Sequence, residues 1–301
     1  MDKTSFDITG ETAVYGIIGS PVSHSLSPVL QNLISKYMGL NTVYVPFDVP
    51  PGETAQALRG AFSLGIRGLN VTVPHKVEVM DALCEVHPQA AMAGAVNTLK
   101  LTENGYAGYN TDIPGLLRAF KEHNVSLEDK TVVIIGAGGA ARAAAFAAAK
   151  ERAGSVIIVN RTIAKARGLM ENILAHFPSA AVEIKNFEEA ESIRSAHVLI
   201  QATTLGMHGE NPLAGSRLLR ITPFIMDIIY SPWETPLLSE ARAAGASRAA
   251  GASRAAGTEA VNGFEMLIYQ GIASFELWHN RKVPEVIVKK VLRDMKQYLG
   301  E

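Results

Sequence analysis

A glycine-rich segment lies near the middle of the chain, between an apolar run and an alanine-rich stretch. In VVIIGAGGAARAAA, Gly136, Gly138 and Ala141 form a GxGxxA pattern. The first glycine of such a turn permits a tight bend, the second lets a pyrophosphate approach the backbone, and a small third residue allows close packing of the helix on the strand. The N-terminus of the helix adds N–H donors and a positive dipole. The pattern predicts a dinucleotide site, although glycines also serve in ordinary turns.

The choice between the two nicotinamide dinucleotides depends on the next predicted strand, SVIIVN, which ends at Asn160. A site for NAD usually carries an acidic residue at this point, which binds the ribose hydroxyls. Residues 158–162 contain no carboxylate, and Asn160 is followed by Arg161 and Thr162, with Lys165 close by. An arginine can pair with a 2′-phosphate through two hydrogen bonds. The segment therefore favours NADP over NAD, with a solvated loop arginine as the alternative.

Two hydroxyl side chains precede a predicted helix in the sequence HSLSPVLQNLI. Ser27 is a natural N-cap, with Pro28 at the first helical position. Capping alone can explain Ser27, but it explains Ser25 less well. Because hydroxyls beside a helix N-terminus can bind a carboxylate, the pair predicts a site for a small acid.

The segment NVTVPHK contains a lysine in an unusual predicted place. We expect the strand to end at Val73 and Pro74 to start a helix, which puts Lys76 in the first helical turn. A cation there faces the positive end of the helix dipole, and an ammonium group destabilised in this way can exchange a proton near neutral pH. Lys76 is therefore a candidate general acid and base, with a solvated surface lysine as the alternative.

Further polar residues follow near strand ends, in GAVNT and GYNTD. Asn97, Asn110 and Asp112 are candidates for binding a polar ligand. The asparagines can equally serve turn chemistry, and Asp112 can be the N-cap of a helix predicted over 112–124.

The elements that must position these residues alternate between apolar, β-rich runs and helical patterns, which is typical of βαβ units with parallel sheets. An Asn-Gly pair within 103–105 predicts a hairpin in the first half. Two helices, 263–279 and 284–299, are predicted to close the chain. The predicted strands cover 14–19, 42–49, 68–73, the hairpin arms 95–101 and 106–110, and then 131–138, 155–160, 182–187, 197–203 and 224–230.

One segment repeats itself near the C-terminal third of the chain. RAAGAS occurs at 242–247 and again at 248–253, and RAAGTE follows at 254–259. A six-residue period is too short for a stacked repeat architecture, so we expect a tandem duplication at the surface. Alanine favours helix, whereas the glycine of each repeat costs about 1 kcal/mol there. We therefore expect a lengthened or interrupted helix near 236–257.

Length and composition narrow the class of protein. The 301 residues suit two domains, and 48% apolar against 19% charged residues favours large buried cores over disorder. Because the formal net charge is −1, we expect no partner among nucleic acids or anionic membranes.

The single cysteine, Cys84, excludes an internal disulfide and a thiolate cluster, and we expect no metal. The N-terminus lacks the apolar core of a signal peptide and no apolar run reaches 18 residues, so we expect a cytoplasmic protein.

Taken in order, these motifs resemble those of the shikimate dehydrogenase family from about residue 14 to 280. The resemblance implies NADP-dependent, reversible reduction of 3-dehydroshikimate to shikimate, an oxidoreductase reaction at a CH–OH group in chorismate and aromatic amino acid biosynthesis. It also implies an α/β fold in two parts. Residues 1–112 and 264–301 would form a substrate-binding domain, to which the C-terminal helices return, and 113–263 a Rossmann-like NADP-binding domain. The matching segments are GSPVSHSLSP, NVTVPHK, GAVNT, GYNTD, GAGGAARA, NRT, DIIYSPWETPLL and NGFEMLIYQG.

The resemblance also implies roles for individual residues. Lys76 matches the catalytic lysine, paired with Asp112, and Ser25 and Ser27 match the serines that hold the substrate carboxylate. The other substrate-binding matches are Thr72, Asn97, Asp112, Tyr230 and Gln270. The cofactor-binding matches are Gly136, Ala137, Gly138, Gly139, Ala140, Asn160, Arg161, Thr162, Ile228 and Gly263.

The chain departs from the family pattern at three places. His75 stands where the family often has Phe, Gln201 replaces the Asn of an NAT segment, and the repeat precedes Gly263 and Gln270. The nearest alternative function is a quinate/shikimate dehydrogenase of the same family, with a broader substrate range or use of NAD. A non-catalytic NADP-binding sensor or scaffold is the alternative from another class. A monomer and a homodimer are both compatible with the sequence.

Overall fold

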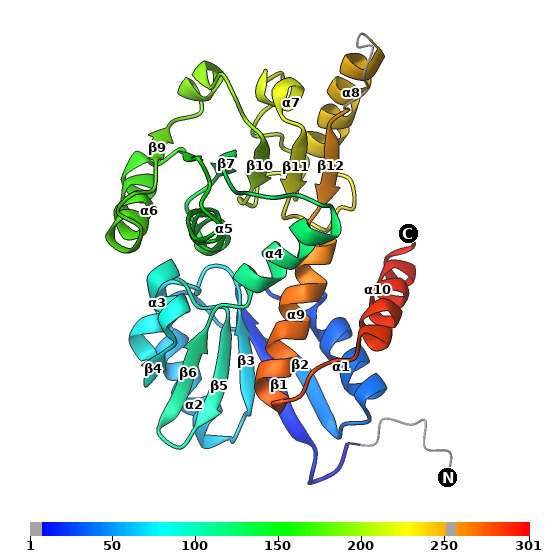
Figure 1. The fold of residues 1–301 in the computed structure, drawn as a ribbon. Helices are drawn as coiled ribbons and strands as arrows, with labels where there is room; N and C mark the ends of the chain where they lie inside the picture. The colour runs from blue at the N-terminus through cyan, green and yellow to red at the C-terminus, as the bar shows by residue number, and fades with distance from the viewer. Residues whose placement is uncertain (1–7, 251–256) are drawn as a thin grey trace. The chain divides into compact units, whose positions relative to one another are not determined.

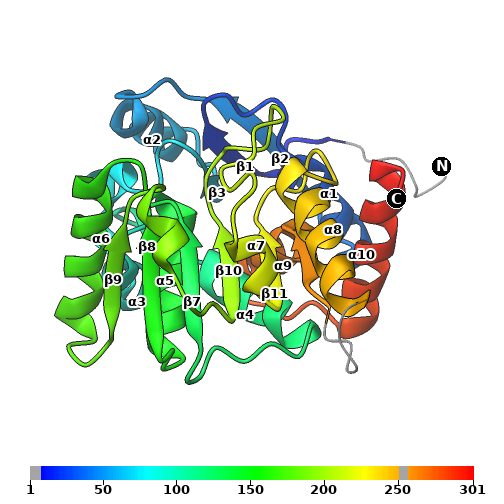
Figure 2. The same cartoon turned by 90° about the horizontal axis from the view of Figure 1, so that it is seen from above.

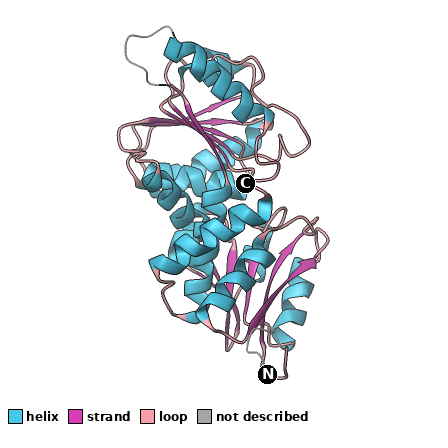
Figure 3. Cartoon of the chain, turned by 90° about the vertical axis from the view of Figure 1, so that its right-hand side faces the viewer, coloured by secondary structure: helices cyan, strands magenta, loops and turns pink. Residues whose placement is uncertain are grey.

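The structure, a computed structural model, describes residues 8–250 and 257–301 (Figure 1). The chain divides into two compact units. The first comprises Met1–Ala91, Ala95–Thr111 and Gln270–Glu301, and the second comprises Met92–Gly94 and Asp112–Tyr269. In the described residues each unit contains one six-stranded sheet flanked by helices (Figure 3). The α/β class expected from the sequence is confirmed.

The sheet of the first unit has the strand order β2-β1-β3-β5-β6-β4. β1 pairs in parallel with β2 and β3, while β5 and β6 form the predicted antiparallel hairpin. Gly105, at the hairpin turn, has a φ of +136°, which favours glycine. The strands are Ala13–Gly19 (β1), Thr42–Asp48 (β2), Gly68–Val71 (β3), Glu85–Val86 (β4), Thr98–Thr102 (β5) and Gly105–Tyr109 (β6).

Helices of the first unit pack on this sheet with apolar faces inward. Leu30 and Ile34 of α1 and Leu58 of α2 are buried, as the helical spacing of their apolar residues requires. The helices are Ser27–Met38 (α1), Thr54–Ser63 (α2), Pro88–Ala93 (α3), of which the last two residues belong to the second unit, and Glu285–Leu299 (α10), with a 3-10 helix over Glu78–Ala82.

The sheet of the second unit is entirely parallel, with the order β12-β11-β10-β7-β8-β9, and Figure 2 shows most of these strands side by side. Counted from β7, this is the 3-2-1-4-5-6 order of dinucleotide-binding folds. The central strands are continuous apolar runs because helices cover both faces of such a sheet. The strands are Thr131–Ile135 (β7), Ser155–Val159 (β8), Val182–Lys185 (β9), Val198–Gln201 (β10), Phe224–Asp227 (β11) and Glu259–Asn262 (β12).

The second unit also contains the helices that follow these strands. Its core joins the strands to α8 through buried apolar side chains such as Leu199, Ile225 and Leu237. The helices are Asp112–Glu122 (α4), Gly139–Lys150 (α5), Ile163–His176 (α6), Leu218–Ile221 (α7), Pro236–Ala250 (α8) and the first six residues of Phe264–His279 (α9), with a 3-10 helix over Glu189–Ser192. None of the described helices is long and apolar enough to cross a membrane.

One element at the end of the second unit was not predicted. β12 follows the alanine-rich repeat, and its four residues become a strand through parallel pairing with β11. α8 runs through Gly245 to Ala250 without interruption, and the rest of the repeat, 251–256, lies outside the described residues.

The prediction of a helix starting at Pro74 is wrong. β3 ends at Val71, residues 73–77 form turns, and a 3-10 helix begins only at Glu78. Lys76 therefore lies in a turn, and the argument from a helix dipole does not apply to it. Periodicity could not separate five residues of turn from a helical first turn in so short a segment.

The prediction that Ser27 is an N-cap is also wrong. The N-cap of α1 is Leu26, whose side chain cannot accept a hydrogen bond, and Ser27 is the first helical residue. Ser25 Oγ accepts a hydrogen bond from Ser27 N at 3.2 Å instead. The proline lies in the first turn, as expected.

Candidate active site

The glycine turn follows β7, at the point where the strand order of the second sheet reverses. Ligands of open α/β sheets bind at such switch points. Gly136 has a φ of +117°, and a Cβ there would lie 3.0 Å from Thr203 Cγ2, so another residue would be strained and crowded. Gly138 is the N-cap of α5, and a Cβ on it would meet nothing within 4 Å. The turn thus leaves open space for an anion at the N-terminus of α5.

Some of the neighbouring residues of the motif face this open space, and others are buried in the core. Gly139 and Ala140 are the first residues of α5 and are partly exposed, as a backbone that receives a pyrophosphate must be. Ala137 and Ala141 are buried, and Ala141 has no exposed surface. The small third residue therefore packs the helix closely on the strand.

Asn160, Arg161 and Thr162 form the connection from β8 to α6. Asn160 Nδ2 donates to Thr162 O at 2.8 Å, which closes a short turn, and Thr162 is the N-cap of α6. Arg161 and Thr162 are exposed. Since Arg161 forms no ion pair with another described residue, its guanidinium is available to an anion from solution.

Gln201, which departs from the family pattern, organises the loop after β10. It is fully buried. Its Oε1 accepts hydrogen bonds from the backbone N and the Oγ1 of Thr203 at 2.7 and 2.8 Å, and its Nε2 donates to Leu205 O at 2.7 Å. Because Thr203 lies against Gly136, this loop forms one wall of the glycine turn.

Ile228 and Gly263 are in direct contact beyond the carboxyl ends of β11 and β12. A Cβ on Gly263 would lie 1.9 Å from Ile228 O, so only glycine fits at this position. Gly263 N also donates to Ile229 O at 3.0 Å. Tyr230 lies on the same loop and is partly exposed. The structure thus brings these three predicted residues together in the second unit.

Asp227, at the end of β11, is a buried carboxyl group that our sequence analysis missed. Its Oδ1 accepts a hydrogen bond from Ile229 N at 3.1 Å and its Oδ2 accepts one from Thr235 Oγ1 at 2.8 Å. Burial raises the pKa of Asp227 to about 6. The signal was a carboxylate inside the apolar run FIMDIIY, where a charge needs hydrogen-bond partners.

Ser25 and Ser27 lie at the N-terminus of α1 in the first unit, where Ser27 is buried. The hydrogen bond that Ser25 Oγ accepts from Ser27 N leaves the Ser25 hydroxyl hydrogen free to donate. The Ser27 hydroxyl forms no hydrogen bond with the described residues. Both can therefore donate to a carboxylate.

Asn97 and Gln270, far apart in the sequence, also meet in the first unit. Asn97 Nδ2 donates to Gln270 Oε1 at 3.4 Å. The orientation of the Asn97 amide is fixed from behind, because its Oδ1 accepts hydrogen bonds from Thr111 N at 2.7 Å and from Thr98 Oγ1 at 3.0 Å. Asn97 directly precedes β5 and Gln270 lies on α9. The pair presents amide groups suited to hydroxyl recognition.

A buried network of polar side chains supports this pair, and our sequence analysis missed it. Asn70 Nδ2 donates to Ser274 Oγ at 2.9 Å, and Ser274 Oγ lies 2.8 Å from Thr98 Oγ1 and 2.9 Å from Thr111 Oγ1. The network joins β3, β5 and α9. Such networks make a polar core rigid when every member is paired, but spacing along the chain does not reveal them.

Backbone hydrogen bonds fix the segments that contain Thr72 and Lys76, and Asp112 begins a helix. Thr72 N donates to Ile18 O at 2.9 Å, directly after β3. Lys76 O accepts a hydrogen bond from Val96 N at 2.8 Å, which ties the turn to the segment before Asn97. Asp112 is buried at the first position of α4. By the division into units, Lys76 belongs to the first and Asp112 to the second.

His75, next to Lys76, points into the core. The residue is fully buried, with its Nε2 2.7 Å from Val49 O and its Nδ1 3.0 Å from Thr54 Oγ1. A carbonyl oxygen only accepts, so Nε2 carries the hydrogen in its bond to Val49 O. Both ring nitrogens have a hydrogen-bond partner in the core, which makes His75 a structural residue.

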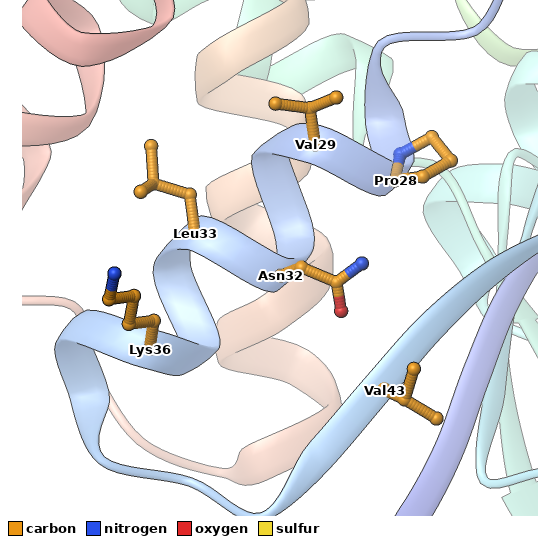
Figure 4. Close-up of a pocket in the computed structure, with 6 residues that line it drawn as sticks. All are labelled: Pro28, Val29, Asn32, Leu33, Lys36 and Val43. Atoms are coloured by element: carbon orange, nitrogen blue, oxygen red, sulfur yellow. The ribbon is translucent and has the colours of Figure 1, made fainter. Parts of the chain in front are cut away.

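A groove of about 510 Å³ lies between α1 and β2 (Figure 4). The Asn32 side chain at its edge exchanges two hydrogen bonds of 2.9 Å with the backbone of Tyr44. No predicted site residue lines the groove. In the part of the chain that the structure describes, no group of His, Cys, Asp and Glu side chains could hold a metal ion. The lining residues are Pro28, Val29, Asn32, Leu33, Lys36 and Val43.

Comparison with known proteins identifies the family. Residues 17–99 match the shikimate dehydrogenase substrate binding domain, 118–211 match shikimate/quinate 5-dehydrogenase, and 263–293 match the shikimate 5′-dehydrogenase C-terminal domain. A shikimate dehydrogenase (NADP(+)) of Methanothermobacter thermautotrophicus is 40% identical over 290 residues, which cover 95% of this chain and 98% of that one. The chain belongs to the shikimate dehydrogenase family.

Solved structures of this family share the fold. A shikimate dehydrogenase in complex with NADP+ has a TM-score of 0.83 and 38% identity, over 96% of this chain and 97% of that one. The shikimate 5-dehydrogenase of Listeria monocytogenes, in complex with shikimate and NAD, has a TM-score of 0.82 and 31% identity, over 97% of this chain and all of the other. The expected Rossmann-like fold of the family is thereby confirmed.

Proposed function

We propose that the protein catalyses the reversible, NADP-dependent reduction of 3-dehydroshikimate to shikimate, as an oxidoreductase of chorismate and aromatic amino acid biosynthesis. The observation that carries the proposal is the similarity to NADP-dependent shikimate dehydrogenases over 95% of the chain. The lysine and aspartate that the family motifs require are both present, as Lys76 and Asp112.

The first unit supplies most of the groups proposed to bind substrate. Ser25 and Ser27 would hold the carboxylate through their available hydroxyl hydrogens. Asn97 and Gln270 would bind ring hydroxyls through the amide pair described above. Thr72, Asp112 and Tyr230 would add further contacts to the substrate. Buried, pre-oriented amides are suited to this task because little side-chain freedom is lost on binding.

Lys76 is the proposed proton donor. In the reduction, its ammonium group would protonate the developing alkoxide oxygen, and in the oxidation the neutral amine would remove the hydroxyl proton. Asp112 would orient the lysine and accept a hydrogen bond from a ring hydroxyl. Proton transfer by a positioned side chain typically contributes about 10²–10⁴-fold to the rate.

The residues of the second unit fit NADP. The open space at Gly138 and the N-terminus of α5 would receive the pyrophosphate, and the exposed Arg161 would pair with the 2′-phosphate. Asn160 and Thr162 would bind the adenosine side, while backbone groups of Ile228 and Gly263 would contact the nicotinamide side. When bound, NADPH supplies the hydride that reduces the ring carbonyl carbon.

Three further assignments belong to the proposal. Residues 1–112 and 264–301 are the proposed substrate domain and 113–263 the proposed NADP domain, and the two compact structural units have similar boundaries at Thr111 and Tyr269. The protein acts on small molecules without a nucleic-acid or membrane partner, in the cytoplasm. It works as a monomer or a homodimer.

A steady-state assay tests the function. NADP+ reduction is followed by absorbance with shikimate and with quinate, and each substrate is repeated with NAD. Activity with shikimate and NADP+ well above the other combinations is the expected result. Comparable rates with quinate or NAD would favour the quinate/shikimate alternative, and no turnover with any combination would favour a non-catalytic NADP-binding protein.

A further inference from the structure

Gln31 is a buried polar residue of α1 outside the proposed substrate and cofactor sites. It is 2% exposed. Its Nε2 donates to Gly271 O, on α9, at 2.9 Å. Its Oε1 is buried and accepts no hydrogen bond from the described residues. A buried acceptor without a partner costs stability, so packing alone does not explain a glutamine at this position.

The hydrogen bond of Gln31 lies between two groups proposed to bind substrate. Ser27 precedes Gln31 by four residues, about one helical turn, so the two share a face of α1. Gly271, whose carbonyl accepts the bond, directly follows Gln270. The contact therefore connects the proposed carboxylate site to the proposed hydroxyl site within the first unit.

Gly271 allows α1 and α9 to approach closely, and it fixes how far α9 is shifted along α1. A Cβ on Gly271 would lie 2.4 Å from Leu30 Cδ2, so the Leu30 side chain occupies the place of a side chain on α9. Sliding α9 by one residue would move it about 1.5 Å and turn it by about 100°. Such a shift would break the Gln31 hydrogen bond and bring a larger side chain against Leu30.

We infer that Gln31 is a positioning residue for substrate, which sets the place of Gln270 relative to Ser27 through the Gly271 carbonyl. The inference rests on the proposed function, in which those two residues hold opposite parts of the substrate. Asn97 holds the Gln270 side chain from the other direction. A ring acid with a carboxylate and hydroxyls at fixed separation is bound well only when α1 and α9 keep that separation.

Gln31→Met tests the inference, because methionine has a similar length and forms no such hydrogen bond. The KM for shikimate should rise roughly 3- to 10-fold, the loss expected for one hydrogen bond. The KM for NADP+ and the kcat should stay unchanged. The melting temperature should not fall, because the substitution also removes the unpaired Oε1.

Ser35→Ala is the matched control. Ser35 is buried one turn further along α1 and accepts a hydrogen bond from Thr42 Oγ1 at 2.7 Å, on β2 rather than α9. Its loss should lower the melting temperature and leave both KM values unchanged. Gly271→Ala tests the same register from α9, also if Gln31→Met fails to fold, and should raise the KM for shikimate.

A double-mutant cycle with Gln270→Ala gives the second readout. If Gln31 acts through Gln270, adding Gln31→Met to Gln270→Ala should change the KM for shikimate little further. Fully additive effects would overturn the inference, as would an equal rise of both KM values or a shikimate effect no larger than that of Ser35→Ala. If Gln270→Ala and Ser27→Ala both leave the shikimate KM unchanged, the proposed substrate roles fail, and the inference with them.

Discussion

At the scale of single residues, the proposed chemical roles belong to polar and charged side chains and to the backbone of the glycine turn. The neighbours of these residues are already satisfied. His75 beside Lys76 has both ring nitrogens bonded in the core, and Gln201 beside the glycine turn has both amide atoms bonded to its own loop. The two departures from the family pattern are therefore structural, and the proposed chemistry remains with Lys76 and Arg161.

Replacing Lys76 by alanine should lower the turnover number by about 10²–10⁴-fold, because it removes the proposed proton donor. The KM for shikimate should change much less, since the serines, Asn97 and Gln270 still bind the substrate. Steady-state kinetics measure both, with Lys36→Ala, an exposed lysine of the same unit, as the control. Asp112→Ala should affect both constants, and the double variant should be far less than additive. A rise of KM alone would make Lys76 a binding residue.

Arg161→Ala should weaken the binding of NADP far more than that of NAD. The loss of charge-assisted hydrogen bonds to the 2′-phosphate corresponds to roughly 1.5–3 kcal/mol. The KM values for both cofactors give the comparison, and Arg167→Ala, an exposed arginine of α6, is the control. An equal loss for both cofactors would show that Arg161 does not read the 2′-phosphate.

Asp227→Asn should change how stability depends on pH. Because burial raises the pKa of this carboxyl to about 6, above its usual value of about 4, its contribution favours the folded state at low pH. That contribution is lost as the pH rises through about 6, and the full difference amounts to roughly 3 kcal/mol. An asparagine does not titrate, so the variant should gain stability relative to the parent between pH 4 and pH 7.5.

Urea unfolding at the two pH values measures this gain, with Asp81→Asn, an exposed carboxyl, as the control. A difference between variant and parent that is the same at both pH values would contradict the pH prediction. The pKa of about 6 already includes the opposing effect of the Ile229 and Thr235 hydrogen bonds to the carboxylate.

At the scale of elements, the repeat can be understood as an insertion between two residues that are already adjacent. A Cβ on Gly245 would lie 2.8 Å from Thr258 N, although 12 residues separate Gly245 from Thr258. The residues before and after are firmly held, because Arg242 pairs with Glu234 at 2.6 Å and donates to Ala260 O at 3.1 Å.

Deleting residues 242–253 should leave a folded enzyme with the activity of the parent. The resulting sequence, EARAAGTEAVN, is the same as that of a chain in which Gly245 is joined directly to Thr258. Arg254 then takes the sequence position of Arg242, so the contacts of this arginine and the register of β12 can persist. Shortening a connection changes its entropy only slightly. Thermal melting and turnover of the variant decide the matter. Loss of either would show that the removed residues pack against something.

At the scale of the whole molecule, the chain passes between its two units several times. Thr111 ends a segment of the first unit, and Tyr269 ends the second unit in the middle of α9. α3 is divided between the units as well. A helix that contributes residues to both units couples their stabilities, because unfolding of either unit removes part of its packing.

The molecule should therefore unfold in one cooperative transition, despite its length. The two tryptophans allow a direct test, since Trp233 lies in the second unit and Trp278 in the first. In Trp233→Phe and Trp278→Phe variants the remaining fluorescence reports on one unit, and circular dichroism reports on the whole. Fluorescence and circular dichroism transitions in urea should coincide in each variant, and NADP+ should shift all of them together. Separate midpoints would show that the units unfold independently.

The sequence by itself determined the features that depend on local pattern. Apolar runs set the strands, and an Asn-Gly pair set the β5–β6 hairpin, because both need only neighbouring residues. The glycine turn and the missing carboxylate after β8 pointed to NADP for the same reason. The ordered motifs implied the family, which the comparisons confirmed.

Only the tertiary structure decided the features that depend on contacts between distant segments. β12 exists because β11 lies beside it, and Gln31 meets Gly271 across most of the chain. The turn at Lys76 and the buried network around Ser274 depend on contacts with segments that are distant in the sequence. Local periodicity gives no information about such contacts. Hydrogen bonds inside a core form where the fold brings donors and acceptors together, so spacing along the chain cannot locate them.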